Sequence, residues 1–301
     1  MAGEELRLEH RPELTRPVLV ASFRGWNDGA QGASKASAFL SRLWHAEQFA
    51  EIDPEQFFDF QSTRPHVSLS EGKVRQIDWP ENSFQHARPP RSDRDVVLLL
   101  GTEPNLRWRT FAQHVSGLAK DVGVEMVVTL GSLLADVPHT RPAPVTASAS
   151  DSKLMKELGV QPSRYEGPTG IVGVLHDACG AVGIPSVSLW AAVPHYVSLT
   201  PSPRAAKALC DRLATLLDVP LDTSELEEAS DAYMQQVSEA VAADEDTAAY
   251  VEELEGRVDE VVEESDLPSG DALAAELTRF LRERDEGDGE DDGLRPESGP
   301  S

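Results

Sequence analysis

The sequence has very few cysteines: Cys179 and Cys210 are the only two among 301 residues. Small secreted domains held by disulfides carry many closely spaced cysteines, so this class is excluded. Both cysteines lie in apolar stretches with helical spacing. We expect them to be reduced and buried in the core.

Long apolar runs are also missing. No window reaches the ~18 consecutive apolar residues that indicate a membrane span. The first 17 residues are mixed and charged, without the apolar centre of a signal peptide. We therefore expect a cytoplasmic protein without a membrane segment.

Basic residues are scarce toward the C-terminus. The formal net charge is −25, and residues 221–301 hold 5 Lys and Arg against 27 Asp and Glu. Residues 1–220 are nearly balanced, with 22 against 25. The acidic field repels phosphate backbones and anionic lipid, so nucleic acid and membrane surfaces are excluded as partners.

The signatures of common catalytic and metal sites are absent from the sequence. It contains neither G-x-G-x-x-G nor a lysine-containing phosphate loop, and no G-x-S-x-G nucleophile elbow. Its eight histidines show no H-x-x-x-H or clustered Cys/His spacing. We predict no metal and no cofactor.

Short apolar runs alternate with amphipathic helical patterns in the first 220 residues. Buried strands are predicted at residues 17–23, 96–100, 124–130 and 186–191. Helices are predicted at residues 30–44, 111–122, 169–182 and 203–217. This alternation predicts an α/β fold with a mainly parallel sheet covered on both faces.

Residues 58–88 break the alternation. Apolar and polar residues alternate from Val67 to Ile77 around residues 70–73, which is typical of a β-hairpin. We therefore predict one α/β core over residues 1–220, with a hairpin excursion near 58–88 that either projects to a partner or shields a pocket.

From residue 221 the pattern changes to acidic helices with narrow apolar seams. Apolar residues recur at helical spacing through 226–241, 251–261 and 273–281. We expect residues 221–284 to form a helical extension that packs on itself or on the core and offers an acidic surface to a basic partner. Residues 285–301 are rich in Gly, Asp and Glu, and we predict a disordered tail.

Polar and aromatic residues follow several predicted strands. Because the carboxyl ends of parallel strands meet at one edge of a sheet, we expect these residues to converge in a candidate crevice. The candidates are Trp26, Asn27, Asp28, Glu103, Asp136, His139, Arg141, Trp190, His195 and Tyr196.

Two interpretations of these residues stay open. Carboxylates, two histidines and an arginine suffice for general acid–base chemistry, yet they also form the hydrogen-bonded rim of an ordinary sheet. In the turn at residues 24–29, Asn27 or Asp28 caps the following helix, or the helix N-terminus receives an anion. Asp28 would compete with a phosphate there.

Five segments together resemble the proteasome assembly chaperone 2 family in its bacterial branch: GWNDG, GTEPNLRW, LGSLLADVPHTRP, YEGPTGIVG and SLWAAVPHYVSLTPSP. The resemblance covers Val18 to Val219. It implies a three-layer α/β/α sandwich similar to the phosphorylase/hydrolase architecture, proteasome-related protein partners, and a homo-oligomer with a trimer as the first expectation. The family-like positions are the ten candidates and Trp108, and none is a known catalyst in the family.

We therefore expect a non-catalytic assembly chaperone or scaffold that acts through protein–protein surfaces. The alternative is a hydrolase or phosphorylase for a small nucleoside-like molecule, a substrate class that rests on fold analogy alone. A crevice that brings the candidate carboxylates and histidines within hydrogen-bond reach favours the enzyme. A crevice filled by Trp26 and Trp190 favours the scaffold.

Overall fold

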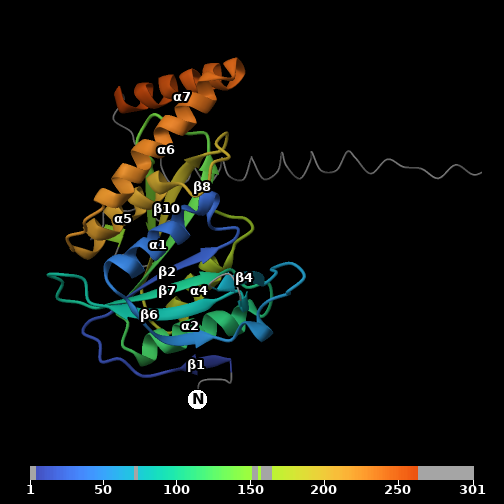
Figure 1. Ribbon diagram of the computed structural model, residues 1–301. Helices are drawn as coiled ribbons and strands as arrows, with labels where there is room; N and C mark the ends of the chain where they lie inside the picture. Colours follow the sequence, from blue (N-terminus) through green and yellow to red (C-terminus); the bar gives the residue numbers. More distant parts are fainter. Residues whose placement is uncertain (1–4, 71–73, 151–154, 157–164, 264–301) are drawn as a thin grey trace, which may run out of the picture.

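The computed structural model describes residues 5–70, 74–150, 155–156 and 165–263. Its centre is an eight-stranded sheet with the order β1-β3-β6-β7-β2-β8-β10-β9 (Figure 1). The strands are β1 (Leu6–Leu8), β2 (Val18–Arg24), β3 (Glu47–Ile52), β6 (Asn82–Ala87), β7 (Val96–Thr102), β8 (Met126–Ala135), β9 (Val145–Ala149) and β10 (Ser186–Pro194).

The four central strands, β7, β2, β8 and β10, are parallel. Their aliphatic sequences are buried on both faces, as the central strands of a parallel sheet require. The predicted parallel core is confirmed, and the flanking strands make the whole sheet mixed because they pair antiparallel. The connection from β6 to β7 is too short for the crossover that a parallel pair needs.

Helices cover both faces of the sheet, so the predicted three-layer sandwich is confirmed (Figure 1). One layer contains α1 (Gly32–Leu43) and α5 (Pro203–Leu217), and the other contains α2 (Trp108–Asp121) and α4 (Ile171–Ala181). Alternate residues of β2 face opposite layers: Val18 and Val20 pack toward α1, whereas Leu19 and Ala21 pack toward α2.

The parallel pair β8–β10 runs past the ends of its neighbours. β8 pairs with β2 only as far as Leu130 but with β10 as far as Ala135. The sequence pattern predicts this strand only as far as residue 130. Gly131 instead continues the strand and leaves room for Trp190, whose ring would lie 2.6 Å from an added Cβ. At ~3.3 Å per residue, the pair extends about 16 Å beyond its contact with β2.

A separate two-stranded sheet contains β4 (His66–Ser70) and β5 (Val74–Asp78). β6 follows it and pairs antiparallel with β7, so β6 begins where β7 ends. The hairpin therefore leaves the body at the carboxyl edge of the parallel strands. β6 itself belongs to the main sheet, although it falls inside the predicted excursion. Two 3-10 turns, η1 (Gly29–Gln31) and η2 (Pro54–Gln56), complete this edge.

The acidic helices α6 (Ser224–Ala242) and α7 (Glu245–Glu263) follow the core. α6 packs on α5, and α7 packs on α6 (Figure 1). Their buried apolar side chains are Leu226, Tyr233, Val237, Val251 and Leu254. The predicted seam at 273–281 and the predicted tail at 285–301 lie outside the described residues. In the described part of the chain, every helix is too short or too polar to cross a membrane.

Both cysteines are free and buried, as predicted. Cys210 packs in the layer of α1 and α5, and Cys179 packs in the layer of α2 and α4. Burial raises the pKa of Cys179 to about 12. Both thiols therefore stay protonated at neutral pH and act as small apolar side chains.

A buried imidazole links α4 to the sheet. His176 Nε2 lies 3.0 Å from Thr129 Oγ1, and its Nδ1 lies 2.5 Å from Ser186 Oγ. Burial lowers the pKa of His176 to about 4. The ring is therefore neutral in the folded protein at pH 7, and both of its nitrogens face hydroxyl groups.

His176 should make the fold sensitive to acid. The unfolded imidazole takes up a proton near pH ~6.5, whereas the folded one does so only at about 4. Stability present above pH 6.5 is therefore lost as the pH falls toward 4, by about 1.4 kcal/mol per pH unit. His176→Gln should flatten the pH dependence of the unfolding free energy by that slope. Urea unfolding at pH 7, 6 and 5 measures it, and equal slopes in the two proteins would contradict the assignment.

Candidate functional site at the carboxyl edge

The predicted site residues lie within or after the central parallel strands, and those that follow a strand share one edge of the sheet. Both candidate histidines are at this edge. The long β8–β10 pair divides the edge into two levels. Asn27, Asp28 and Glu103 form the inner level, and the residues after Ala135 and Pro194 form the outer level.

Glu103 directly follows β7 and holds three segments together. Its Oε1 accepts hydrogen bonds from Asn27 Nδ2 at 3.0 Å and from the backbone N–H of Ile171 at 2.8 Å. Its Oε2 accepts one from the backbone N–H of Trp26 at 3.3 Å. Ile171 is the first residue of α4, and free N–H groups at a helix start favour a negative charge. Glu103 thus caps α4 from a neighbouring strand.

Two glycines permit this close packing. A Cβ on Gly170 would lie 2.5 Å from Asn27 Nδ2 and 2.8 Å from Glu103 Oε1. Gly25 has φ +129°, a conformation that L side chains rarely adopt. The turn after β2 and the start of α4 therefore require glycine at these two positions.

Asp28 caps α1 with one carboxylate oxygen. Its Oδ1 accepts hydrogen bonds from the backbone N–H groups of Ala33 at 2.9 Å and Ser34 at 3.1 Å. The residue is 7% exposed, and burial raises the pKa of Asp28. Of the two alternatives for this turn, the structure shows capping, because the chain's own carboxylate occupies the start of α1.

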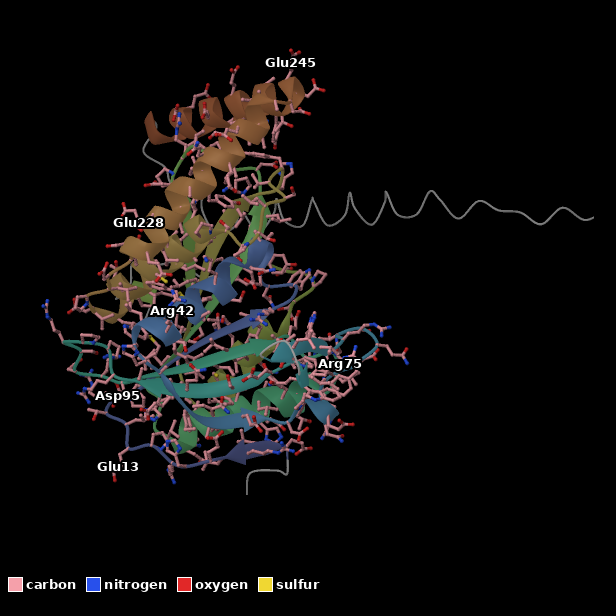
Figure 2. The ribbon with its side chains drawn as sticks, in the orientation of Figure 1. Glu13, Arg42, Arg75, Asp95, Glu228 and Glu245 are labelled. Atoms are coloured by element: carbon pink, nitrogen blue, oxygen red, sulfur yellow. The ribbon has the colours of Figure 1, made fainter. Side chains whose placement is uncertain are left out.

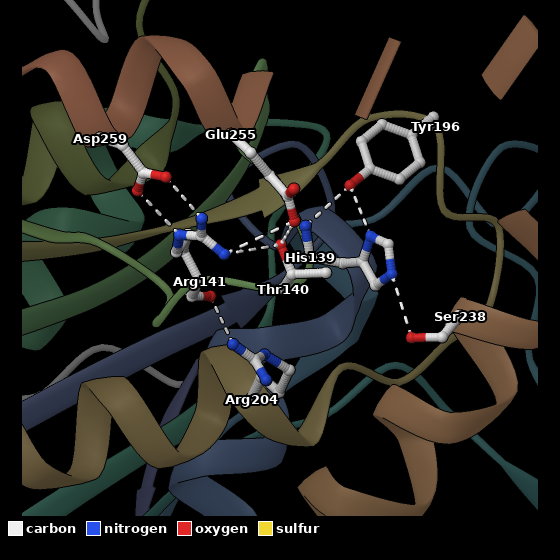
Figure 3. A network of polar contacts seen from close by, with 8 residues as sticks. All are labelled: His139, Thr140, Arg141, Tyr196, Arg204, Ser238, Glu255 and Asp259. Carbon is white, nitrogen blue, oxygen red and sulfur yellow. Dashed lines mark hydrogen bonds and ion pairs between the residues drawn. The ribbon is translucent and has the colours of Figure 1, made fainter. Parts of the chain in front are cut away.

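His139 connects the outer level of the edge to α6. Its Nδ1 lies 2.9 Å from Tyr196 Oη, and its Nε2 lies 3.2 Å from Ser238 Oγ (Figure 3). Burial, followed by the nearby charge of Arg204, lowers the pKa of His139. Burial also raises the pKa of Tyr196 to about 12. Because Tyr196 Oη already accepts the backbone N–H of His139 at 2.7 Å, the contacts fit a phenol that donates to Nδ1 and an Nε2–H that donates to the serine.

Arg141 connects the same level to α7. Its Nη2 lies 2.7 Å from Asp259 Oδ2 and its Nε lies 3.0 Å from Asp259 Oδ1, a bidentate pair (Figure 3). Glu255 accepts from the hydroxyl of Thr140 and lies 3.5 Å from the guanidinium. The hydrogen bond from Arg141 lowers the pKa of Asp259. Arg204 of α5 donates to the carbonyl oxygen of Arg141.

Asp136 and His195 form a pair at the ends of β8 and β10. His195 Nδ1 lies 3.0 Å from Asp136 Oδ1. The imidazole meets the rings of Tyr196 and Tyr250 edge-on, with centroids 5.8 Å and 5.6 Å away. Tyr250 belongs to α7. A histidine–carboxylate pair is a component of many general bases, but here its aromatic neighbours come from the chain itself.

The tryptophans do not fill a crevice at this edge. Trp26 is 45% exposed on the inner turn. Trp190 lies over Gly131 and donates from Nε1 to Ser188 Oγ at 2.7 Å. Glu103 binds Asn27 and the start of α4, and Asp28 binds the start of α1. His139 contacts Tyr196 and α6. The candidate residues thus form three contacting groups along the edge: Trp26 and Asn27 with Glu103, His139 with Tyr196, and Asp136 with His195.

Sequence reasoning missed the partners on the acidic helices. Ser238 lies on α6, and Tyr250, Glu255 and Asp259 lie on α7. The spacing of four between Glu255 and Asp259 places both on one side of a helix, but nothing in a single sequence indicates that Arg141 faces them. Among the described residues, no group of three or more His, Cys, Asp or Glu side chains is placed to hold a metal ion.

Comparison with known proteins agrees with this fold. The PAC2 family model matches residues 22–241. A PAC2 family protein from Streptomyces avermitilis is 47% identical over 78% of this chain and 99% of its own, with a TM-score of 0.73. A Mycobacterium tuberculosis protein described as a proteasome-assembly chaperone homologue is 46% identical over the same shares, with a TM-score of 0.71. The chain belongs to the PAC2 family.

A third solved structure extends the likeness. A Mycobacterium tuberculosis protein described as of unknown function is 29% identical over 93% of this chain and 96% of its own, with a TM-score of 0.80. A search of curated proteins gave no match. The family expected from the five sequence segments is confirmed by the family model and by the first two structures.

Removing the Glu103 carboxylate should loosen the inner level of the edge. Glu103→Ala leaves the start of α4 and the Asn27 amide without their acceptor, which should cost about 2 kcal/mol of unfolding free energy. Glu125→Ala is the matched control, because that carboxylate only faces Arg16 at 3.6 Å on the surface. Denaturant unfolding measures both. Equal stability of the two variants would contradict the capping role.

Removing Arg141 should release α7 without unfolding the core. Arg141→Ala loses the bidentate bond to Asp259, so amide exchange in α7 should accelerate by about tenfold, while exchange in the central strands stays unchanged. Arg257→Ala is the control, because Arg257 pairs with Glu253 within α7 itself. Hydrogen-exchange mass spectrometry measures the amide exchange of α7 and of the central strands in both variants. Equal protection of α7 in the two variants would show that Arg141 does not hold the helix.

Proposed function

We propose that this chain is a non-catalytic assembly chaperone for the subunits of a proteasome-type particle. The observation that carries the proposal is that the polar groups of the carboxyl edge bind the chain's own helices. Glu103 and Asp28 cap helices, and His139 and Arg141 fasten α6 and α7. These groups act as structural ties, which leaves the outer surface of the protein as the part that acts on others.

Family membership supports the same proposal. One PAC2-type relative, 46% identical, is described as a proteasome-assembly chaperone homologue. A chaperone of this kind binds a free subunit more tightly than the assembled particle, so the final contacts of assembly displace it by mass action. Because the sequence contains no phosphate-binding loop, we propose passive binding and release.

The alternative, a hydrolase or phosphorylase for a nucleoside-like molecule, has less support. Its strongest feature is the pair Asp136–His195, with a nitrogen–oxygen distance of 3.0 Å. Such an enzyme would also need a binding position beside this pair, and here the ring of Tyr250 from α7 lies against the imidazole.

The chaperone proposal also includes self-association of the chain, with a trimer as the first expected form.

An assembly assay tests the proposal. Purified α-type and β-type proteasome subunits from the same organism are mixed below the concentration at which they assemble quickly, with and without the chain, and particle growth is followed by light scattering. The chain should shorten the half-time of assembly by about tenfold, which corresponds to stabilising the assembly intermediates over the free subunits by about 1.4 kcal/mol. Light scattering of the chain alone reports its own oligomeric state.

The control variant separates chaperone from enzyme. Asp136→Asn removes the charge of the histidine–carboxylate pair, and it should change the half-time by less than about twofold, as for a substitution without a direct role. The proposal fails if the wild-type chain neither binds the subunits nor alters their assembly. Turnover of nucleosides by the wild-type chain that Asp136→Asn abolishes would support the enzyme instead.

A further inference from the structure

The hairpin of β4 and β5 has one apolar face that no part of the described chain covers. Directly opposite residues in an antiparallel pair share a face, so Val67, Leu69, Arg75 and Ile77 lie together. Val67 is 60% exposed, Leu69 63% and Ile77 53%. His66, Ser68, Gln76 and Asp78 lie on the other face. A hairpin with this division normally buries its apolar face.

The root of the hairpin is firmly built. Phe60 and Trp79 pack edge-on with centroids 4.8 Å apart. Asn105, in the loop after β7, accepts hydrogen bonds at its Oδ1 from the Asp59 N–H and the Thr63 hydroxyl, both at 3.0 Å. The neighbouring Leu106 N–H donates to the Phe57 carbonyl at 3.0 Å. These contacts anchor the root of the hairpin to the body, and the apolar face beyond the root is exposed.

Further exposed apolar side chains lie on segments that leave the same edge. Trp79 is 49% exposed, Leu106 48% and Trp26 45%. Trp26 follows β2 and Leu106 follows β7. In the sheet, β7 is next to β6, the strand that follows the hairpin, and β2 is next to β7. Most of the exposed large apolar side chains in the described chain thus belong to the half of the edge that α6 and α7 do not cover.

Charge selects the kind of partner. Arg75 is the one charged side chain on the apolar face among the described hairpin residues. Two hairpins of the same chain stacked on these faces would bring two arginines together, with no carboxylate on this face among the described hairpin residues, a costly arrangement in a desolvated interface. The acidic helices of a second copy do not fit either, because no large apolar side chain of their described residues is exposed.

We propose that this face, defined by Val67, Leu69, Arg75 and Ile77, docks a partner protein surface that presents aliphatic side chains around a carboxylate. The inference rests on the proposed function, and the partner is an unassembled proteasome-type subunit whose assembly surface is still exposed. The aliphatic side chains supply apolar burial, and Arg75 pairs with the carboxylate. Arg75 lies far from the acidic residues Glu228 and Glu245 (Figure 2), so the docking face is separate from α6 and α7.

Matched variants test the proposal on the full chain. Val67→Ser with Ile77→Ser should weaken binding to the purified unassembled subunit by at least about tenfold, as expected for central contacts of an interface. Arg75→Gln should weaken it by about threefold to tenfold. Gln76→Glu changes the net charge by the same amount on the opposite face, and it should leave binding within about twofold. All changed side chains are exposed, so thermal unfolding should stay unaltered.

The outcomes separate this inference from the proposed function. Wild-type binding that survives in the double variant overturns the docking face and leaves the chaperone function standing. No wild-type binding to either subunit overturns both. If the variants instead abolish self-association, or binding to vesicles of neutral lipid, with subunit binding unchanged, the face belongs to a second copy or to a membrane and the inference is wrong. Loss in Val67→Ser/Ile77→Ser and Arg75→Gln, with Gln76→Glu unchanged, supports it.

Discussion

The long parallel pairing of β8 with β10 is the constraint on which the rest of the structure depends. It continues about 16 Å beyond the ladder with β2, and Gly131 leaves room for the Trp190 ring across the strand. The turn after β2 contacts β8 at Ser132, whereas His139 and His195 follow the ends of the pair at Ala135 and Pro194. The carboxyl edge, where open parallel sheets commonly bind ligands, becomes two separate levels, and each level holds helices in place.

This division accounts for the opposite characters of the two halves of the edge. The outer level is polar, and it binds the acidic extension through Arg141, Ser238 and Tyr250. The half formed by β6, β7 and β2 carries the hairpin and exposes Trp26, Leu106 and Trp79. The acidic helices therefore lie over one half of the edge, and most of the exposed large apolar side chains of the described chain lie on the other half.

Much of the fold was predictable because each central strand is a short aliphatic run, and α5 was predicted with its observed bounds, Pro203–Leu217. The extent of β8 was not, because whether Gly131 ends or continues a strand depends on Trp190, 59 residues away. The shared edge of the candidate residues followed from parallel topology. Their separation into two levels depends on strand length, and the pairing of Arg141 with Asp259 depends on how α7 is oriented. Local sequence periodicity predicts neither the strand length nor the orientation of the helix.

The state of the His139 imidazole tests the central claim most directly, and nitrogen-15 NMR of histidine side chains measures it. The claim is that the polar groups of the carboxyl edge tie the chain's own helices rather than meet a substrate. It predicts that His139 is the neutral Nε2–H tautomer at pH 7 and that more than half of the rings are still neutral at pH 6.5, the ordinary histidine pKa. It also predicts that the nitrogen signals of the ring do not shift when a nucleoside and phosphate are added. A ring that titrates at or above its ordinary pKa, or that shifts saturably with those ligands, would contradict the account.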